Sequence, residues 1–263
     1  MMISMTSIAL VAVSATFTVK THLDNCVGPP PAASPREKLT QANGTPGHDT
    51  IVFSGLTQAT IAICDCMPQM NDSITIDGEF VLGGATTNVE IDGSLLTTSM
   101  CNAIFETAPF ATGLTIENMV FDGAGTTDVQ AVDTVGVANF TLSNIEVRNF
   151  EGAPMLIEGT NIASQAIFQQ LDIHDNETQS TPVQINAVFT EIGDSSIVDN
   201  VATDTADALT PKVLGGALRI GGSPTDFAQI YRSDFSANQA DDGGALWTAA
   251  ETNLTQCSFR DNV

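Results

Sequence analysis

The chain has 263 residues, of which 43% are hydrophobic and 15% are charged, and 31 acidic against 8 basic residues give a formal net charge of −23. This apolar fraction is ample for a folded core, which excludes disorder over most of the length. The acidic excess repels phosphate backbones and anionic lipid, which excludes nucleic acid as a partner. No stretch approaches the ~20 apolar residues of a membrane helix, so we expect no transmembrane segment.

Residues 1–15 resemble a short secretory signal. An apolar run extends from Ile8 to Val13, and Val13-Ser14-Ala15 is similar to a cleavage site. The basic segment that normally precedes such a run is missing. A misplaced start and a first β-strand are the alternatives.

Residues 16–99 do not follow the repeat found further along, and we expect them to form an N-terminal cap and the first coils. Thr16–Val19 and Asp49–Phe53 have the composition of strands. Between them, Ser34 can cap a short helix, Pro35 suits its first position, and Glu37 can close a capping box. Asn43-Gly44 would end that helix.

Residues 100–263 contain a repeat with intervals of 24, 26 or 38 residues. An apolar anchor followed by a polar turn recurs at Phe121, Val147, Ile173, Ile197, Phe235 and Phe259. Apolar residues stand five positions before each anchor, and a one-residue shift follows them at Asn118, Asn144 and Gln170. This pattern predicts two short strands that meet at a corner, because a helix would need apolar residues at i+3, i+4 and i+7.

Three residues after four of the anchors stands an asparagine. One residue type at one corner of a stacked coil can form a ladder along the axis, in which each amide donates to one neighbour and accepts from the other. The residues of this predicted structural ladder are Asn176, Asn200, Asn238 and Asn262. A third strand follows each corner, and glycine pairs at 215–216 and 243–244 allow a tight bend before two of these strands.

Three strands per coil of about 25 residues predict an all-β parallel β-helix, a solenoid, with an N-terminal cap that contains one short helix. A TIM barrel or a Rossmann sheet would need helical crossovers between its strands, and the sequence has none.

Two sets of motifs resemble a known family. Phe235-Ser236-Ala237-Asn238 and Gly243-Gly244-Ala245-Leu246 look like the repeats of polymorphic outer-membrane proteins. The segment from Pro35 to Phe53, with Asp72–Gly78 after it, resembles the CSLREA-type domain that precedes right-handed β-helix repeats in bacterial surface proteins. The resemblance implies a right-handed β-helix that is extracellular or on the cell surface, associated with the outer membrane. The signature cysteine of that family falls here at Ala33, and the chain stops just after a corner, so we expect a truncated C-terminus.

Catalysis would need converging acid and base groups. The candidates are Asp241 and Asp242 as carboxylates, with Arg148 and His174 as bases. Asp122, Arg148 and His174 occupy one column of successive coils, and an ion-pair ladder is the alternative role. The corner residues Asp77, Asp92 and Asp122 sit in glycine turns, where aspartate is a structural choice.

The 38-residue interval contains two lengthened corners, and loops that leave a rigid scaffold are the usual place for binding. The binding candidates there and nearby are Asp204, Asp207, Asp226, Tyr231 and Trp247. Calcium is the ion that Asp204 and Asp207 would bind, although their spacing is not that of an EF loop or a nonapeptide repeat. We expect no other cofactor.

Five cysteines, at positions 26, 64, 66, 101 and 257, are compatible with one or two disulfides and a free thiol, and their pairing is left open. Their spacing does not suit a structural zinc site.

The sequence therefore favours a secreted or cell-surface β-helix that acts as an adhesin-like or structural binding module without catalysis. Its partner would be an extracellular protein or a glycan. The alternative is a carbohydrate-active enzyme, a polysaccharide lyase or a glycoside hydrolase, that uses an acidic face of the helix.

Overall fold

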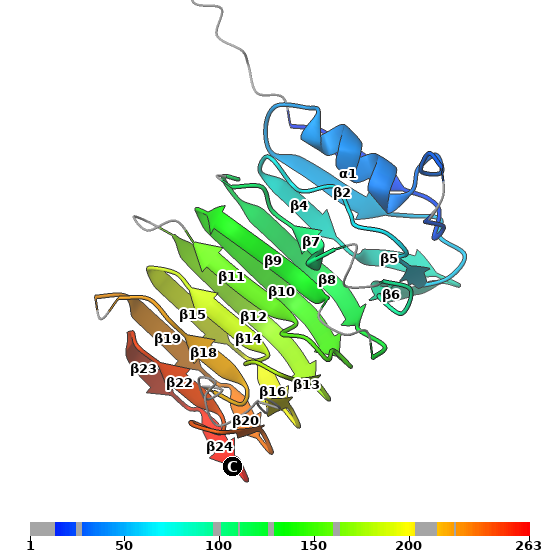
Figure 1. Cartoon of the computed structure of the whole chain (residues 1–263). Helices are drawn as coiled ribbons and strands as arrows, with labels where there is room; N and C mark the ends of the chain where they lie inside the picture. The colour runs from blue at the N-terminus through cyan, green and yellow to red at the C-terminus, as the bar shows by residue number, and fades with distance from the viewer. Residues whose placement is uncertain are drawn as a thin grey trace, which may run out of the picture.

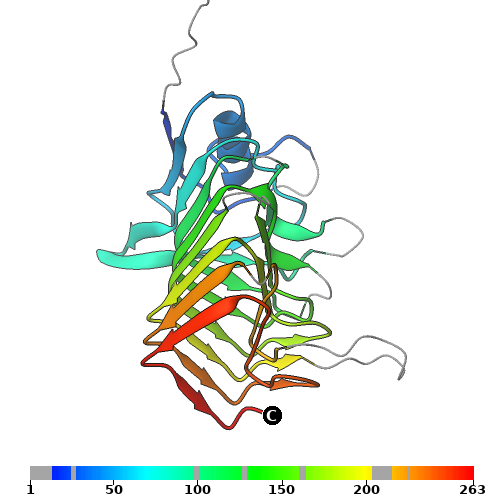
Figure 2. The ribbon, with the colours of Figure 1, turned by 90° about the vertical axis from the view of Figure 1, so that its left-hand side faces the viewer.

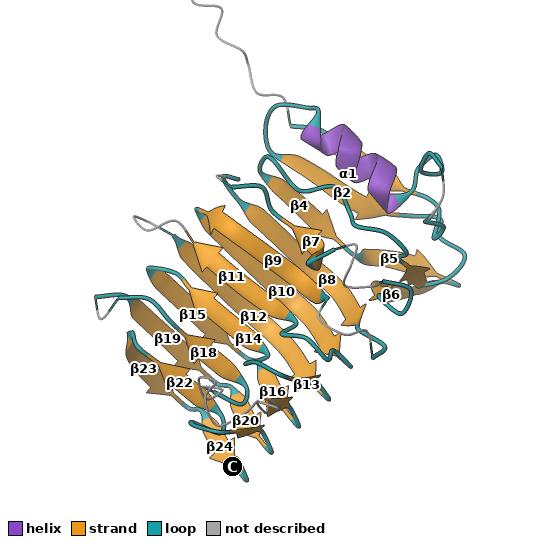
Figure 3. Cartoon of the chain, viewed as in Figure 1, coloured by secondary structure: helices purple, strands orange, loops and turns teal. Residues whose placement is uncertain are grey.

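The computed structural model is a parallel β-helix of about seven turns, which confirms the predicted fold class (Figures 1 and 3). It describes residues 14–24, 28–96, 101–109, 111–125, 129–159, 164–202, 215–223 and 225–263. Asp204 and Asp207, and most of the signal-like segment, lie outside the described residues. Coils stack one on another from the N-terminal helix to the C-terminus, and Figure 2 shows this stack from the side.

The largest sheet runs along the whole stack and has fifteen strands. Its strands are parallel apart from the antiparallel β5–β6 hairpin. They are β1 (Thr16–Val19), β2 (Asp49–Phe53), β3 (Thr60–Ala62), β4 (Ile74–Asp77), β5 (Glu79–Leu82), β6 (Ala85–Asp92), β8 (Leu114–Asp122), β10 (Asn139–Arg148), β12 (Gln165–His174), β15 (Phe189–Gly193), β16 (Ser196–Val198), β19 (Phe227–Tyr231), β20 (Asp234–Ser236), β23 (Glu251–Thr255) and β24 (Ser258–Arg260).

Two smaller parallel sheets form the other sides of the stack, and the smaller of them is confined to three of the later coils. The six-stranded sheet consists of β7 (Ala103–Glu106), β9 (Gln130–Val137), β11 (Met155–Gly159), β14 (Val183–Asn186), β18 (Leu218–Ile220) and β22 (Leu246–Thr248). The three-stranded sheet consists of β13 (Glu177–Thr178), β17 (Val201–Ala202) and β21 (Gln239–Ala240). β14 is one of the predicted third strands, and β18 and β22 follow the glycine pairs at 215–216 and 243–244 as expected, while β11 belongs to a coil for which no third strand was specified.

The large sheet bends at a column of left-handed residues. Asn118, Asn144 and Gln170 have φ values of 58°, 54° and 56°, so the predicted one-residue shift is the corner between two arms of one strand. Asparagine tolerates this conformation better than most residues. Asn144 Nδ2 donates to Asn118 Oδ1 at 2.8 Å, which adds an amide contact between coils that the sequence analysis missed.

The predicted asparagine ladder is present at the next corner. Asn176 Nδ2 donates to Asn200 Oδ1 at 2.8 Å, and Asn200 Nδ2 donates to Asn238 Oδ1 at 3.0 Å. Asn238 Nδ2 continues the series to Asn262 Oδ1 at 3.1 Å. The first three asparagines are buried, so these bonds satisfy amide groups that water does not reach.

The glycine pairs act as expected. Gly215 and Gly243 have φ values of 82° and 69°, where other residues are strained. A Cβ on Gly216 would lie 2.1 Å from the carbonyl oxygen of Gly244, so the coils approach too closely there for any side chain.

The cap contains the helix α1 (Pro35–Asn43). Ser34 is its N-cap and accepts a hydrogen bond from the Glu37 backbone N–H, while the Glu37 carboxylate accepts from the N–H of Ala33, one residue before the position of a standard capping box. Arg36 connects the helix to the first coils. Its guanidinium contacts both oxygens of the buried Asp24 carboxylate, at 2.9 and 2.7 Å, and the carbonyl oxygen of Asp65 at 2.7 Å.

The core is one continuous column of apolar side chains. The anchor residues from Phe121 to Phe235 are fully buried. In the last described coil the anchor Phe259 is 41% exposed, and Leu254, five positions before it, is 48% exposed.

Candidate functional site

Arg148 is the centre of an ion-pair cluster on the outer face of the large sheet. Its guanidinium lies 2.9 Å from Asp122 Oδ2 and 2.9 Å from Glu90 Oε2, and it also contacts Glu146. These carboxylates and the positive charge stabilise one another, which raises the pKa of Arg148 although burial opposes its charge. Arg148 thus stays protonated, and a protonated guanidinium cannot act as a base.

The same cluster includes the other predicted base, His174. Its Nδ1 lies 2.8 Å from Asp175 Oδ2, and its Nε2 lies 3.4 Å from Glu146 Oε1. Burial opposes the charged imidazole, but contacts with Asp175, Asp172 and Glu146 outweigh burial and raise its pKa. The geometry of the column at Asp122, Arg148 and His174 is therefore that of an ion-pair ladder, the alternative role predicted for it.

The turn aspartates also have structural partners. Burial raises the pKa of Asp122, but hydrogen bonds from Asn149, Arg148 and the N–H of Ala124 outweigh it and hold that pKa below its ordinary value. Asp77 Oδ1 accepts from Asn118 Nδ2 at 2.8 Å, and Asp92 Oδ1 accepts from the N–H of Ser94 at 2.8 Å. These carboxylates hold turns and coils together.

Asp241 and Asp242 are not brought to the predicted bases. Both are exposed, in the turn after β21. Their coil is three steps along the axis from that of Arg148, by way of β12, β16 and β20. At ~4.8 Å per step this is a separation of about 14 Å along the axis alone. Asp241, Asp242, Arg148 and His174 therefore do not form one catalytic group in this structure.

Tyr231 and Trp247 lie on different sheets, on β19 and β22. The Tyr231 hydroxyl donates to Glu191 Oε1 at 2.7 Å, and this bond raises its pKa. The Tyr231 ring covers Gly193, where a Cβ would lie 2.5 Å from the ring. Trp247 packs beside Arg219, whose guanidinium carbon lies 5.4 Å from the ring centroid. Each aromatic residue contacts its own sheet, so the two do not form a joint binding platform.

Asp226 lines a cleft of about 580 Å³ that runs across the corners between the six-stranded sheet and the large sheet. β11, β14 and β18 end at this edge, and β12, β15 and β19 begin there. The polar residues at the cleft are Glu158, Ser164, Asn186, Ser223 and Asp226. Successive coils repeat the same corner, so residues far apart in sequence become neighbours along the axis.

Two glycines make room for the polar side chains of the cleft. A Cβ on Gly221 would lie 2.0 Å from Asn186 Oδ1, and a Cβ on Gly159 would lie 2.2 Å from Ser164 Oγ. Asp226 is held by its own turn, because its Oδ2 accepts from the N–H of Ser223 at 2.6 Å. No described residue hydrogen-bonds to the side chains of Glu158 or Asn186, so both remain able to bind a ligand.

A second, more open groove of about 690 Å³ follows the left-handed corner. Its charged groups are largely engaged with one another. Arg232 binds both oxygens of Asp194 at 2.6 Å, and Arg260 lies 2.7 Å from Asp234 Oδ2. Among the uncharged side chains of this groove, those of Gln170, Gln256 and Ser258 have no hydrogen-bond partner in the described residues.

Asp133 on β9 is an unusual carboxyl group, only 8% exposed, and its Oδ1 has no hydrogen-bond partner in the described residues. Burial and the charges of Glu106 and Glu158 raise its pKa to about 6. Among the described carboxyl groups its pKa has the largest upward shift. Nothing in the sequence identified it, because the pattern around β9 indicates only a buried strand.

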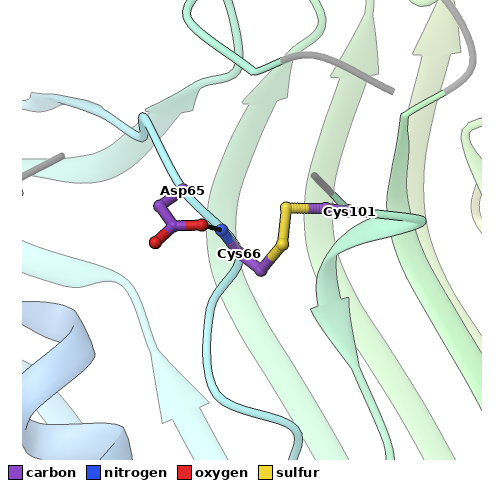
Figure 4. A group of neighbouring side chains, drawn as sticks. All are labelled: Asp65, Cys66 and Cys101. Atoms are coloured by element: carbon purple, nitrogen blue, oxygen red, sulfur yellow. Dashed lines mark hydrogen bonds between the residues drawn. A yellow bond between two sulfur atoms is a disulfide. The ribbon is translucent and has the colours of Figure 1, made fainter. Parts of the chain in front are cut away.

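The cysteines form no metal site in the described residues. Asp65, Cys66 and Cys101 are the one described group of three or more ligand-type residues within 4.8 Å of one another, but Cys66 and Cys101 form a disulfide, and its sulfurs are not thiolates (Figure 4). Cys64 is disulfide-bonded as well, and Cys257 is free. The neighbours Cys64 and Cys66 do not pair with each other.

Comparison of the chain with known protein families, with curated proteins and with solved structures found no match. In the described part of the chain, no helix has the length and hydrophobicity of a membrane span.

Of the predicted binding residues, the structure places Asp226 at the cleft and leaves Tyr231 and Trp247 outside it. Sequence analysis missed Glu158, Ser164 and Asn186. The signal that could have found them is their position, since each stands within three residues of the end of an apolar strand or the start of the next, at the same corner in neighbouring coils.

Proposed function

We propose that this protein is a secreted or cell-surface β-helix that acts as an adhesin-like or structural binding module and does not catalyse a reaction. The observation that carries the proposal is the contrast between two parts of the surface. The charged column with acid–base potential, around Arg148, is closed by its own ion pairs, whereas the cleft beside Asp226 keeps free polar side chains.

The disulfide between Cys66 and Cys101 supports an extracellular location, since disulfides persist in oxidising compartments. The likeness of the repeats to polymorphic outer-membrane proteins, and of the N-terminal segment to the CSLREA-type domain, supports a place at the outer surface of a bacterium. Surface labelling of intact cells that express the natural protein tests this part of the proposal, and a purely cytosolic pool would overturn it.

The partner would be an extracellular protein or a glycan. The net charge of −23 disfavours polyanionic partners, because a long-range field of one sign slows and weakens their association. A rigid solenoid suits a binding role, because its backbone holds exposed side chains in fixed positions without ordering on binding.

The test of the non-catalytic role is incubation with acidic and neutral polysaccharides, with and without calcium, followed by measurement of new reducing ends and unsaturated products. We expect no product above that of a buffer control. A product that disappears in Asp241→Ala or Arg148→Ala would overturn the proposal in favour of a hydrolase or lyase.

A further inference from the structure

We propose that the cleft at Glu158, Asn186 and Asp226, together with the adjoining Phe189–Phe227 pair, binds a neutral glycan. This inference rests on the proposed binding function and assigns a ligand class and a place to it. It follows from the free polar groups in the cleft, the aromatic pair beside it and the charge around it.

The polar groups in the cleft are suited to sugar hydroxyls. Glu158 can accept through both carboxylate oxygens and Asn186 can both donate and accept, since no described residue engages either side chain. Ser164 is only 2% exposed and its Oγ accepts from the N–H of Val188 at 3.1 Å, so it helps to fix the wall of the cleft. Asp226 uses Oδ2 in its own turn and keeps Oδ1 as an acceptor. Adjacent hydroxyl groups of a sugar need this mixture of donors and acceptors.

An aromatic surface adjoins these groups. Phe189 and Phe227 are cross-strand neighbours at the first positions of β15 and β19, on the outer side of the large sheet, with ring centroids 6.0 Å apart and an angle of 18° between the rings. Both are half-buried. Val188 and Asp226 line the cleft and directly precede the two phenylalanines in sequence, so the aromatic surface begins where the cleft ends.

This pair and the cleft together provide two kinds of contact. The apolar C–H face of a sugar ring can pack on a phenylalanine while the hydroxyl groups of the same or the next ring reach the cleft. Ligand sites of about 300–1,000 Å³ that combine apolar surface with a few fixed polar groups are typical for small molecules, and the cleft is within that range.

The negative charge of the cleft and of the whole chain determines which glycans can bind. Two carboxylates line the cleft, no lysine or arginine is among its described lining residues, and the whole chain carries −23. Uronic acid, sulfate or phosphate groups would meet repulsion there without a counter-charge. A lysine side chain of a protein partner would be attracted and could donate to the carboxylates, but its ammonium group has no acceptor for the Asn186 amide N–H, which a sugar hydroxyl supplies.

The experiment measures binding of the purified full chain to neutral oligosaccharides (glucans, mannans, galactans and N-acetylglucosamine oligomers) and to polygalacturonate, heparin and polylysine. We expect binding to at least one neutral class and none to the two polyanions. Asp226→Asn, Asn186→Ala and Phe227→Ala should each weaken it by about tenfold, as expected for loss of a hydrogen bond to a charged group or of an aromatic contact.

Matched controls remove the same chemistry elsewhere. Asp242→Asn removes an exposed carboxylate far from the cleft, and Val81→Ala removes a side chain that is 63% exposed on the β5–β6 hairpin. Both should bind as the parent chain does. Ser223→Trp, a substitution at an exposed turn residue, should obstruct the cleft, and circular dichroism and thermal melting would show that each variant is folded.

The outcomes separate this inference from the proposed function. Neutral glycan binding that the cleft variants do not weaken would overturn the inference and leave the binding function intact. No binding to any neutral glycan, or binding to polylysine alone, would also overturn it, the latter in favour of a cationic protein partner. Binding followed by release of reducing ends would overturn the non-catalytic function instead.

Discussion

The side chain of Asn200 has no exposed surface and connects three coils. Its Nδ2 donates to the carbonyl oxygens of Ile173 and Val198 and to Asn238 Oδ1, while its Oδ1 accepts from the side-chain and backbone N–H groups of Asn176. In such a network each amide satisfies buried groups on both sides, and removal of one amide leaves several of them without a partner.

Asn200→Ala should therefore lower the free energy of unfolding by about 2–3 kcal/mol, the order expected when buried polar groups lose their partners. Urea denaturation followed by circular dichroism would measure it. Asn253→Ala is the control, because Asn253 is exposed on β23, and it should change stability by about 0.5 kcal/mol or less. Equal effects of the two substitutions would contradict the structural role of the ladder.

For Asp133 we expect a substitution to raise the free energy of unfolding, whereas Asn200→Ala should lower it. Its pKa of about 6 lies above the ordinary value of 3.8, so the folded state binds its proton more tightly than the unfolded state does. The stability gained from that proton is present below pH 3.8 and is lost as the pH rises to about 6. At about 1.4 kcal/mol for each pH unit, the loss amounts to about 3 kcal/mol at neutral pH.

Asp133→Asn, which removes the charge, should then stabilise the protein at pH 7.5 and have little effect at pH 4. Urea midpoints at the two pH values would measure the difference, with Asp242→Asn as an exposed control. A gain of the same size at both pH values would show that the buried charge is not the cause.

At the scale of elements, the Cys66–Cys101 disulfide joins the segment after β3 to the start of the segment that forms β7, and the two cysteines are 35 positions apart in sequence. Arg36 of α1 reaches the same region through the Asp65 and Cys66 carbonyl oxygens. Helix, first coils and disulfide thus form one connected cap at the end of the stack.

The double variant Cys66→Ser/Cys101→Ser should be less stable by about 4 kcal/mol, from the loop-closure entropy of the unfolded chain. Thermal melting would measure this loss, and proteolysis should begin in the cap. Cys257→Ser, at the free cysteine, is the matched control and should melt as the parent chain does. A parent-like melting curve for the double variant would mean that packing alone holds the cap.

The elements that depend on local chemistry could be predicted from the sequence. The α1 boundaries follow from Ser34, Pro35 and Gly44, and the bend of the large sheet follows from the shift at Asn118 and Asn144. These signals are local, because capping and left-handed turns are decided by a few consecutive residues.

The candidate site could be predicted only in part. Asp226 stood out because a lengthened corner is visible in the sequence, whereas Glu158 and Asn186 lie in ordinary corners of other coils. What places them together is the stacking register, which pairs Glu158 with Asn186 across β11 and β14. Such register depends on how coils pack over 25 or more residues, and no short sequence window contains that information.

At the scale of the whole molecule, charge opposes the fold. With 31 acidic and 8 basic residues, the compact state concentrates like charges that the unfolded chain holds apart. Several of the carboxylates are compensated by ion pairs, as around Arg148, but 8 basic residues can neutralise only a minority of the 31 acidic residues.

Sodium chloride should consequently raise the melting temperature. Screening over a Debye length that falls from about 30 Å at 0.01 M to about 8 Å at 0.15 M weakens the repulsion between distant carboxylates. We expect a rise of several degrees over this range by differential scanning fluorimetry, and the same rise with potassium chloride. A melting temperature independent of salt would mean that the ion pairs, which salt weakens, balance the repulsion.

The asparagine ladder has a mechanical consequence. Its bonds and those of the parallel sheets run along the axis of the stack, so tension applied between the two ends loads one coil boundary at a time. Tension applied along the strands would instead shear many bonds of one coil together. The molecule should therefore lose its coils one at a time at low force when it is pulled along the axis, and it should withstand a higher force when it is pulled along the strands.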